Sequence, residues 1–171
     1  MKPLALVLGG IELVDHTGPV RQRYEPLVGG DLLRLTKGSG AIMTHWRKSR
    51  IVASGSGYLD PGLEDLNYGH PLELWCVKPL SKDSVGREFV LPVAGGPRPD
   101  YAPWGLAKVG SDWVETELLR SGQAVELVEV EGATAYRLCW MPSFLVHTRG
   151  PVSDFDQATG RYDWSLEAEQ M

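Results

Sequence analysis

The stretch from Gly38 to Cys76, GSGAIMTHWRKSRIVASGSGYLDPGLEDLNYGHPLELWC, decides the fold. Residues 50–54 alternate along the chain and residues 71–77 form a short apolar run, so both predict strands. The insert between them, Tyr58–Tyr68, carries too few apolar side chains for a core of its own, so we expect it to bury them against something else. Its Asp60-Pro61 start is typical of a helix N-terminus and predicts one short helical turn over residues 61–66.

Outside this stretch, short runs of Val, Leu, Ile, Tyr and Trp alternate with the 20 Gly and 12 Pro, which predicts an all-β protein. Two hairpins are expected, Leu32–His45 turning at Lys37–Gly40, and Ala124–Met141. We expect a β domain over residues 1–150 with its insert around residues 55–70, and residues 151–171 as a linker and a C-terminal strand arm.

Within that C-terminal region the sequence changes character. Residues 147–160 are polar and broken by Gly150-Pro151, which is typical of a surface linker. From Tyr162 to Glu169 apolar and polar side chains alternate strictly, which predicts a half-buried strand with an acidic outer face.

Length and charge limit the classes of protein. At 171 residues the chain fits one domain with or without extended arms. A net charge of −5 argues against a nucleic-acid-binding surface. No apolar run approaches the ~20 residues that span a bilayer, and the first ten residues are too short for a signal peptide, so we expect folding in the cytoplasm. There Cys76 and Cys139 are expected as two buried thiols.

Motifs for catalysis are missing from the sequence. The four His are scattered singly without metal-ligand spacing, and no Gly-x-Ser-x-Gly nucleophile or glycine-rich phosphate cradle occurs. We therefore expect no enzyme activity, no metal and no cofactor. Trp104 lies in a Pro-rich segment near Tyr101, so these two rings are either packing anchors or contacts that stack on a sugar.

A resemblance enters at Arg47–Leu74, with Trp46-Arg-Lys before it and Arg23-Tyr-Glu-Pro-Leu-Val-Gly-Gly30 upstream. These segments resemble small structural proteins of the tail tip or distal tail of long-tailed bacteriophages. The resemblance covers about a third of the chain. It implies a tail-tube-like fold of two packed antiparallel sheets, as a sandwich or barrel, with a flanking helix and a long hairpin that docks on the next subunit of a ring.

The function expected from these observations is a structural subunit of a phage tail, located in the virion. Its partners would be copies of itself in a ring and neighbouring tail proteins, with DNA passing through unbound and no membrane contact. The expected interface consists of Trp46, Tyr58, Leu59, Leu63, Leu66, Tyr68, Tyr162 and Trp164. Two alternatives stay open: a carbohydrate-binding β-sandwich using Tyr101 and Trp104, and a hydrolase whose residues meet only in space.

Overall fold

The computed structural model describes residues 4–13, 15–34 and 36–171, and most of its regular structure is antiparallel strand. The predicted all-β class is confirmed. By its internal contacts the chain divides into two compact units, Met1–Glu12 with Glu73–Leu145, and Leu13–Leu72 with Val146–Met171. This division differs from a boundary at residue 150, because residues 162–169 pair with residues 50–57 and residues 146–156 pair in turn with residues 161–170.

The first unit holds three groups of short strands, ordered β2-β1-β5, β10-β11-β7 and β6-β12-β8-β9. Their bounds are β1 Val7–Leu8, β2 Ile11–Glu12, β5 Leu72–Trp75, β6 Leu80–Ser84, β7 Glu88–Val90, β8 Trp104–Val109, β9 Asp112–Thr116, β10 Leu118–Ser121, β11 Ala124–Leu127 and β12 Ala133–Trp140. Apolar side chains from the second and third groups, with Leu91 directly after β7, form one core: Phe89, Leu91, Ala107, Val125, Leu127, Tyr136, Leu138 and Trp140.

The predicted hairpin over Ala124–Met141 is wrong. Strand β11 pairs with β10 and β7, whereas β12 pairs with β6 and β8. Val125 on β11 and Leu138 on β12 are buried in the same core from two different sheets. Residues 128–132 therefore cross between layers instead of closing a hairpin.

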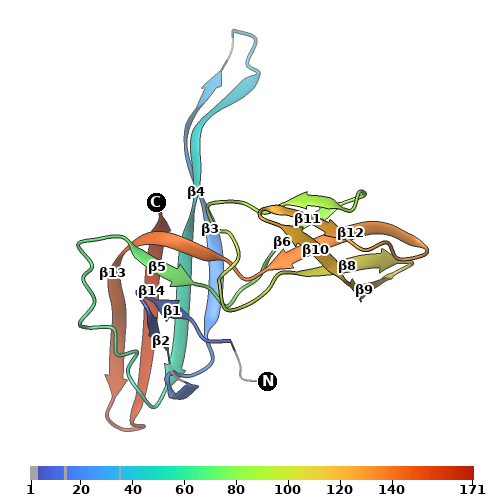
Figure 1. Cartoon of the computed structure of the whole chain (residues 1–171). Helices are drawn as coiled ribbons and strands as arrows, with labels where there is room; N and C mark the ends of the chain where they lie inside the picture. The colour runs from blue at the N-terminus through green and yellow to red at the C-terminus, as the bar shows by residue number, and fades with distance from the viewer. Residues whose placement is uncertain (1–3, 14, 35) are drawn as a thin grey trace. The chain divides into compact units, whose positions relative to one another are not determined.

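The second unit is built on the strand order β13-β14-β4-β3 (Figure 1). It contains the 3-10 helix η1 Asp15–Thr17, β3 Arg21–Arg34, β4 Gly40–Gly57, β13 Ser143–Asp156 from Val146 onward, and β14 Arg161–Gln170. The predicted alternation in β14 is confirmed. Trp164, Leu166 and Ala168 are buried on one face, and the side chains between them are exposed.

The linker expected over residues 147–160 is instead mostly strand. Strand β13 continues to Asp156 because its backbone pairs with β14 from Val146↔Gln170 to Asp156↔Arg161. A shift in register between Thr148 and Pro151 absorbs the Gly-Pro break as a bulge. The polar side chains that suggested a linker lie exposed on a paired strand.

The helical turn expected over residues 61–66 is also absent. Gly62 has a φ of 71°, in the left-handed region, and its N–H donates to the Asp60 carboxylate at 3.1 Å. This conformation ends right-handed helix geometry at the second residue. What remains is a tight turn in which the Leu66 N–H donates to the Leu63 carbonyl at 3.4 Å.

Two further expectations are confirmed. The hairpin that turns at Lys37–Gly40 joins β3 to β4, although it is longer than Leu32–His45 and spans Arg21 to Gly57. Cys76 and Cys139 are both buried thiols that form no disulfide. Burial raises the pKa of the Cys139 thiol, so the thiolate that would act as a nucleophile is disfavoured.

Candidate functional site: an exposed hairpin arm

The distal half of the β3–β4 hairpin leaves the sheet to which it belongs. Strand β14 pairs with β4 only as far as Glu169↔Arg50, after which the Gln170 side chain accepts a last hydrogen bond from the Ser49 N–H at 3.1 Å. From there the pairings of residues Leu27–Lys48 that the structure describes join β3 to β4 alone. We call Leu27–Lys48 the arm, and in Figure 1 it extends past the end of β14.

The arm keeps apolar side chains in solvent. Val28 is 51% exposed, Leu33 47% and Trp46 49%. Trp46 is held in place by Gly29 on the opposite strand, where a Cβ atom would lie only 2.1 Å from the indole ring. Gly29 therefore leaves room for the indole against the opposite strand, and about half of the Trp46 side chain stays exposed.

Both long edges of the arm carry backbone groups available for pairing. β3 is the edge strand of its sheet, and β4 loses β14 at the base of the arm. A two-stranded hairpin on its own is at best marginally stable in water, and open edges are templates for another strand. The register shift at Gly29/Gly30 bends the ribbon but leaves these edges free of any third strand among the described residues.

The arm is also basic on an acidic chain. It contains Arg34, Lys37, Arg47 and Lys48 against a single acidic residue, Asp31, which gives a net charge of +3. The whole chain carries −5, so the residues outside the arm carry −8, with His neutral in both counts. A contact between the arm of one copy and the body of another is therefore electrostatically favoured.

No family model, curated protein or solved structure matches this chain. Among the described residues no helix is long and apolar enough to cross a membrane. The same residues include no group of three His, Cys, Asp or Glu side chains that could hold a metal ion. The exposed arm is thus the feature of this chain that most directly points to a function.

The insert Tyr58–Tyr68 is folded against its own unit. Leu63 is fully buried, and its carbonyl accepts a hydrogen bond from the Tyr68 hydroxyl. The backbone N–H groups of Tyr58 and Leu59 donate to the His16 carbonyl at 2.8 and 3.1 Å. Much of the apolar content that sequence reasoning assigned to an interface therefore stabilises the monomer.

Some insert side chains still reach the surface. Tyr58 and Leu59 are exposed, and the Arg161 guanidinium lies 5.2 Å from the centre of the Tyr58 ring. Leu66 and Tyr68 are half-buried. Tyr58 and Leu59 are consequently the parts of the insert with the most side-chain surface left for a partner.

The other expected interface residues are split between the arm and the sheet. Trp46 lies on the arm. Tyr162 is half-buried beside Phe155, with ring centroids 4.7 Å apart, whereas Trp164 is buried and its indole N–H donates to the Thr17 carbonyl at 2.9 Å. Trp164 thus packs inside its own unit and has no free surface for a neighbour.

The two candidate sugar contacts lie together in the first unit. The rings of Tyr101 and Trp104 have centroids 5.7 Å apart and an angle of 82° between their planes. An edge-to-face pair stabilises both rings, but it does not form a single flat platform on which a sugar ring could stack. This geometry suits the packing interpretation of the two rings better than the sugar-stacking one.

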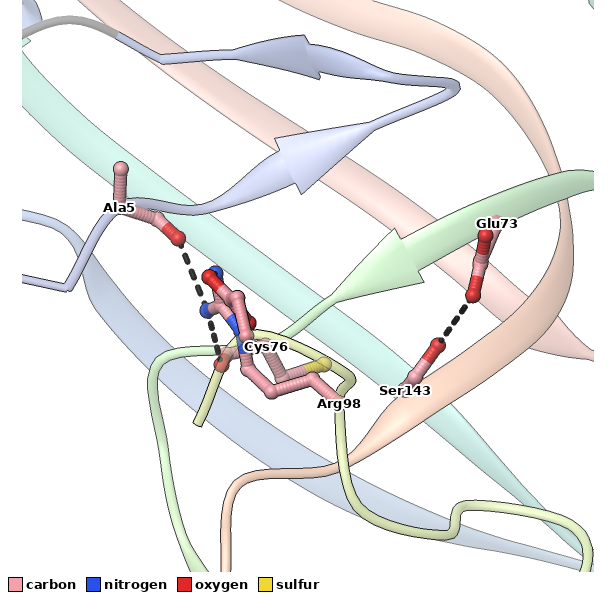
Figure 2. A network of polar contacts seen from close by, with 6 residues as sticks. Ala5, Glu73, Cys76, Arg98 and Ser143 are labelled. Carbon is pink, nitrogen blue, oxygen red and sulfur yellow. Dashed lines mark hydrogen bonds and ion pairs between the residues drawn. The ribbon is translucent and has the colours of Figure 1, made fainter. Parts of the chain in front are cut away.

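Sequence reasoning missed a buried cation, Arg98, in the segment expected to be a loop. Figure 2 shows its guanidinium between the carbonyls of Ala5 and Cys76, which accept hydrogen bonds at 2.9 and 3.0 Å. Asp100 accepts two more, at 2.6 and 2.8 Å, and the Trp75 ring centre lies 5.4 Å away. Four donors are occupied, so this Arg holds three segments together and leaves little capacity for a substrate.

Acidification is expected to destabilise the first unit below about pH 4. Hydrogen bonds from Arg98 lower the pKa of Asp100 from its ordinary value of 3.8, and bonds from Arg137 do the same for Asp83. A carboxylate with a lower pKa in the folded than in the unfolded chain contributes stability above the unfolded value, and that contribution is lost as the pH falls through the folded one. Thermal melts at stepwise lower pH would measure the decline.

The matched control for this pH dependence is Asp100→Asn, which removes one of the two carboxylates. Its melting temperature should fall less steeply with acidification than that of the unsubstituted protein. Identical pH dependence in the two proteins would show that the Asp100 carboxylate does not contribute to it.

Proposed function

We propose that this protein is a structural subunit that assembles with copies of itself through the arm, as part of a bacteriophage tail. The observation that carries the proposal is the arm: a long hairpin that leaves its sheet, exposes Val28, Leu33 and Trp46, and offers two open strand edges. A segment of this kind is stabilised when a neighbouring chain covers it.

The free energies of burial, association and hydrogen bonding indicate which interactions would stabilise a contact made by the arm. Full burial of a large apolar side chain contributes roughly 1.5–3 kcal/mol, so the exposed halves of the three arm side chains contribute about 1 kcal/mol each. Association costs about 4 kcal/mol or more in lost translational and rotational freedom. Apolar burial alone is therefore too small, and strand pairing along the open edges, at about 1 kcal/mol per hydrogen bond, is needed to exceed that cost.

The tail assignment rests on the resemblance of Arg47–Leu74 to tail-tip and distal-tail proteins. The face-to-face sheets of the first unit and the long hairpin of the second are parts that a tail-tube-like fold would require. In a ring each contact joins two different patches, one donating and one receiving. We assign the arm the donating role, with Tyr58 and Leu59 as additional contact residues.

The charge of the arm agrees with a place between subunits. Clustered Lys and Arg facing a DNA channel would hold passing phosphates and release their counterions. An arm with a net charge of +3 therefore fits better against a neighbouring acidic body than in a channel wall. The inner surface of the ring would then be acidic or neutral.

Native mass spectrometry and negative-stain electron microscopy of the purified protein test this proposal. We expect closed particles whose mass is a multiple of 18.8 kDa. A protein that stays monomeric at all accessible concentrations would contradict self-assembly. The place in a phage tail is tested by proteomics of purified particles of a phage whose genome encodes this chain. A protein that assembles but is missing from the tail would refute only the tail assignment.

A further inference from the structure

We infer that the arm of one copy docks on the outer face of the β13–β14 sheet in the next copy, where its basic side chains meet acidic ones. This inference rests on the proposed function, because it names the receiving surface of the same contact. We call this receiving surface the acidic face. It consists of Asp154 on β13 and of Asp163, Glu167 and Glu169 on β14.

The acidic face follows from the strand geometry. On β14 every second side chain points the same way, so the exposed residues Asp163, Glu167 and Glu169 share the face opposite to the buried Trp164 and Leu166. Asp154 joins them because it is the direct register partner of Asp163. The four carboxylates therefore lie on one side of the two strands, and all four residues are exposed.

This arrangement carries unfavourable electrostatics that a basic partner would relieve. Like charges placed directly opposite each other across two antiparallel strands are destabilising, and Asp154 and Asp163 are such a pair. Arg50 lies 3.0 Å from Glu169, and Arg149 lines the groove on the same face. Arg161 and Asp156 are register partners on the same side of the two strands and offset each other. With Arg50, Arg149 and this pair counted, the face keeps a net charge of −2.

The face is also hollowed, so a segment of chain could lie in it. A groove of about 470 Å³ runs beside the bulge of β13 and is lined by Thr148, Gly150, Val152 and Ser165, together with the charged side chains of Arg50, Arg149, Glu167 and Glu169. Val152 is largely exposed within it and provides an apolar contact. The two Arg and two Glu side chains of the groove balance, so the groove itself would receive an exposed apolar side chain of the arm, Val28 or Trp46. The basic side chains of the arm would meet Asp154 and Asp163, which lie two residues along the same strands from Val152 and Ser165.

The occupant has to be the arm of a second copy. The arm begins where β4 separates from β14 and runs on beyond the end of β14 (Figure 1). About a dozen residues separate Arg50 from the turn, and at about 3.3 Å per residue the arm reaches roughly 40 Å from its base. Because the arm leads away from the place where β4 leaves β14 (Figure 1), it does not reach the face beside its own beginning, so its partner surface belongs to another molecule.

Charge reversal with rescue tests the inference. The arm variant, Arg34→Glu with Lys37→Glu, reverses the charge of two side chains on the arm. The face variant, Asp163→Lys with Glu167→Lys, reverses the charge of two side chains on the acidic face. Glu169 is left unchanged because it holds Arg50. We expect each variant to raise the dissociation constant for assembly at least about 10-fold, since like charges would then meet across the contact. The four substitutions combined in one chain should restore assembly.

The control makes the same change of charge in the first unit, Glu129→Lys with Glu131→Lys, where both side chains are exposed. It should leave assembly unchanged and should not rescue the arm variant. Circular dichroism melts confirm that all variants fold, and sedimentation velocity measures assembly.

Three results would overturn the inference: a face variant that assembles normally, a combined variant that does not recover, or rescue by the control. If the arm variant alone loses assembly, the arm keeps its role and only the acidic face is wrong. If the unsubstituted protein does not assemble at all, the proposed function fails as well.

Discussion

A variant with a shortened arm is expected to be a folded monomer under conditions in which the complete chain assembles. Residues 29–46 are replaced by Asn-Gly, because Val28 and Arg47 are direct register partners and a two-residue type I′ turn can join them. The remaining pairs between β3 and β4, and those between β4 and β14, are untouched. Light scattering and thermal melts on one sample would show loss of the oligomer with little change in melting temperature.

The control for general surface hydrophobicity changes Val90→Ser and Leu119→Ser in the first unit, where these side chains are 62% and 65% exposed. This double variant should assemble normally, because its side chains are as exposed as those of the arm but lie on a separate sheet. Retention of the oligomer after arm shortening would contradict the arm as the interface. Unfolding of the shortened variant would show that the arm stabilises the monomer.

The substitution Arg98→Met is expected to cause a large loss of folding stability. The substitution keeps an apolar stem against Trp75 but leaves the carbonyls of Ala5 and Cys76 and the Asp100 carboxylate without their donor. Breaking a buried ion pair on one side costs about 3–5 kcal/mol. The Asp100 side chain is 42% exposed, so water can hydrate its carboxylate once Arg98 is replaced. We therefore expect the free energy of unfolding to fall by about 3 kcal/mol. Denaturant unfolding gives the change in free energy.

Arg137→Met provides a closely matched control. Arg137 donates to both carboxylate oxygens of Asp83, at 2.6 and 2.8 Å, and lies 4.5 Å from the Trp113 ring centre, so its contacts resemble those of Arg98. Its side chain is 35% exposed, whereas that of Arg98 is 1% exposed. An exposed ion pair contributes up to about 1 kcal/mol, so this variant should lose far less stability. Equal losses of stability in the two variants would show that the burial of Arg98 does not determine the size of its contribution.

Local patterns predicted those features of this protein that depend on neighbouring residues. The alternation in Tyr162–Glu169 predicted which face of β14 is buried, because the two faces of a strand are set by a period of two residues. The turn at Lys37–Gly40 and the all-β class followed from short-range signals in the same way.

The tertiary structure decided where strands find their partners. Nothing in residues 124–141 shows that β11 and β12 belong to different sheets, because each has its partners elsewhere in the chain. The insert Tyr58–Tyr68 was expected to bury its side chains at a contact with another subunit, yet Leu63 is fully buried within the single chain. Arg98 looked like an ordinary loop residue because its two carbonyl partners lie 93 and 22 positions away.

The same reason explains the arm. The sequence by itself predicted a hairpin over Leu32–His45 that turns at Lys37–Gly40, and Trp46 lay just beyond it. The hairpin extends beyond its sheet because β14 stops pairing with β4 at Arg50. Strand β14 lies more than a hundred residues later in the chain. Strand pairing over such separations is set by the packing of the whole unit, so only the tertiary structure shows which apolar side chains stay exposed.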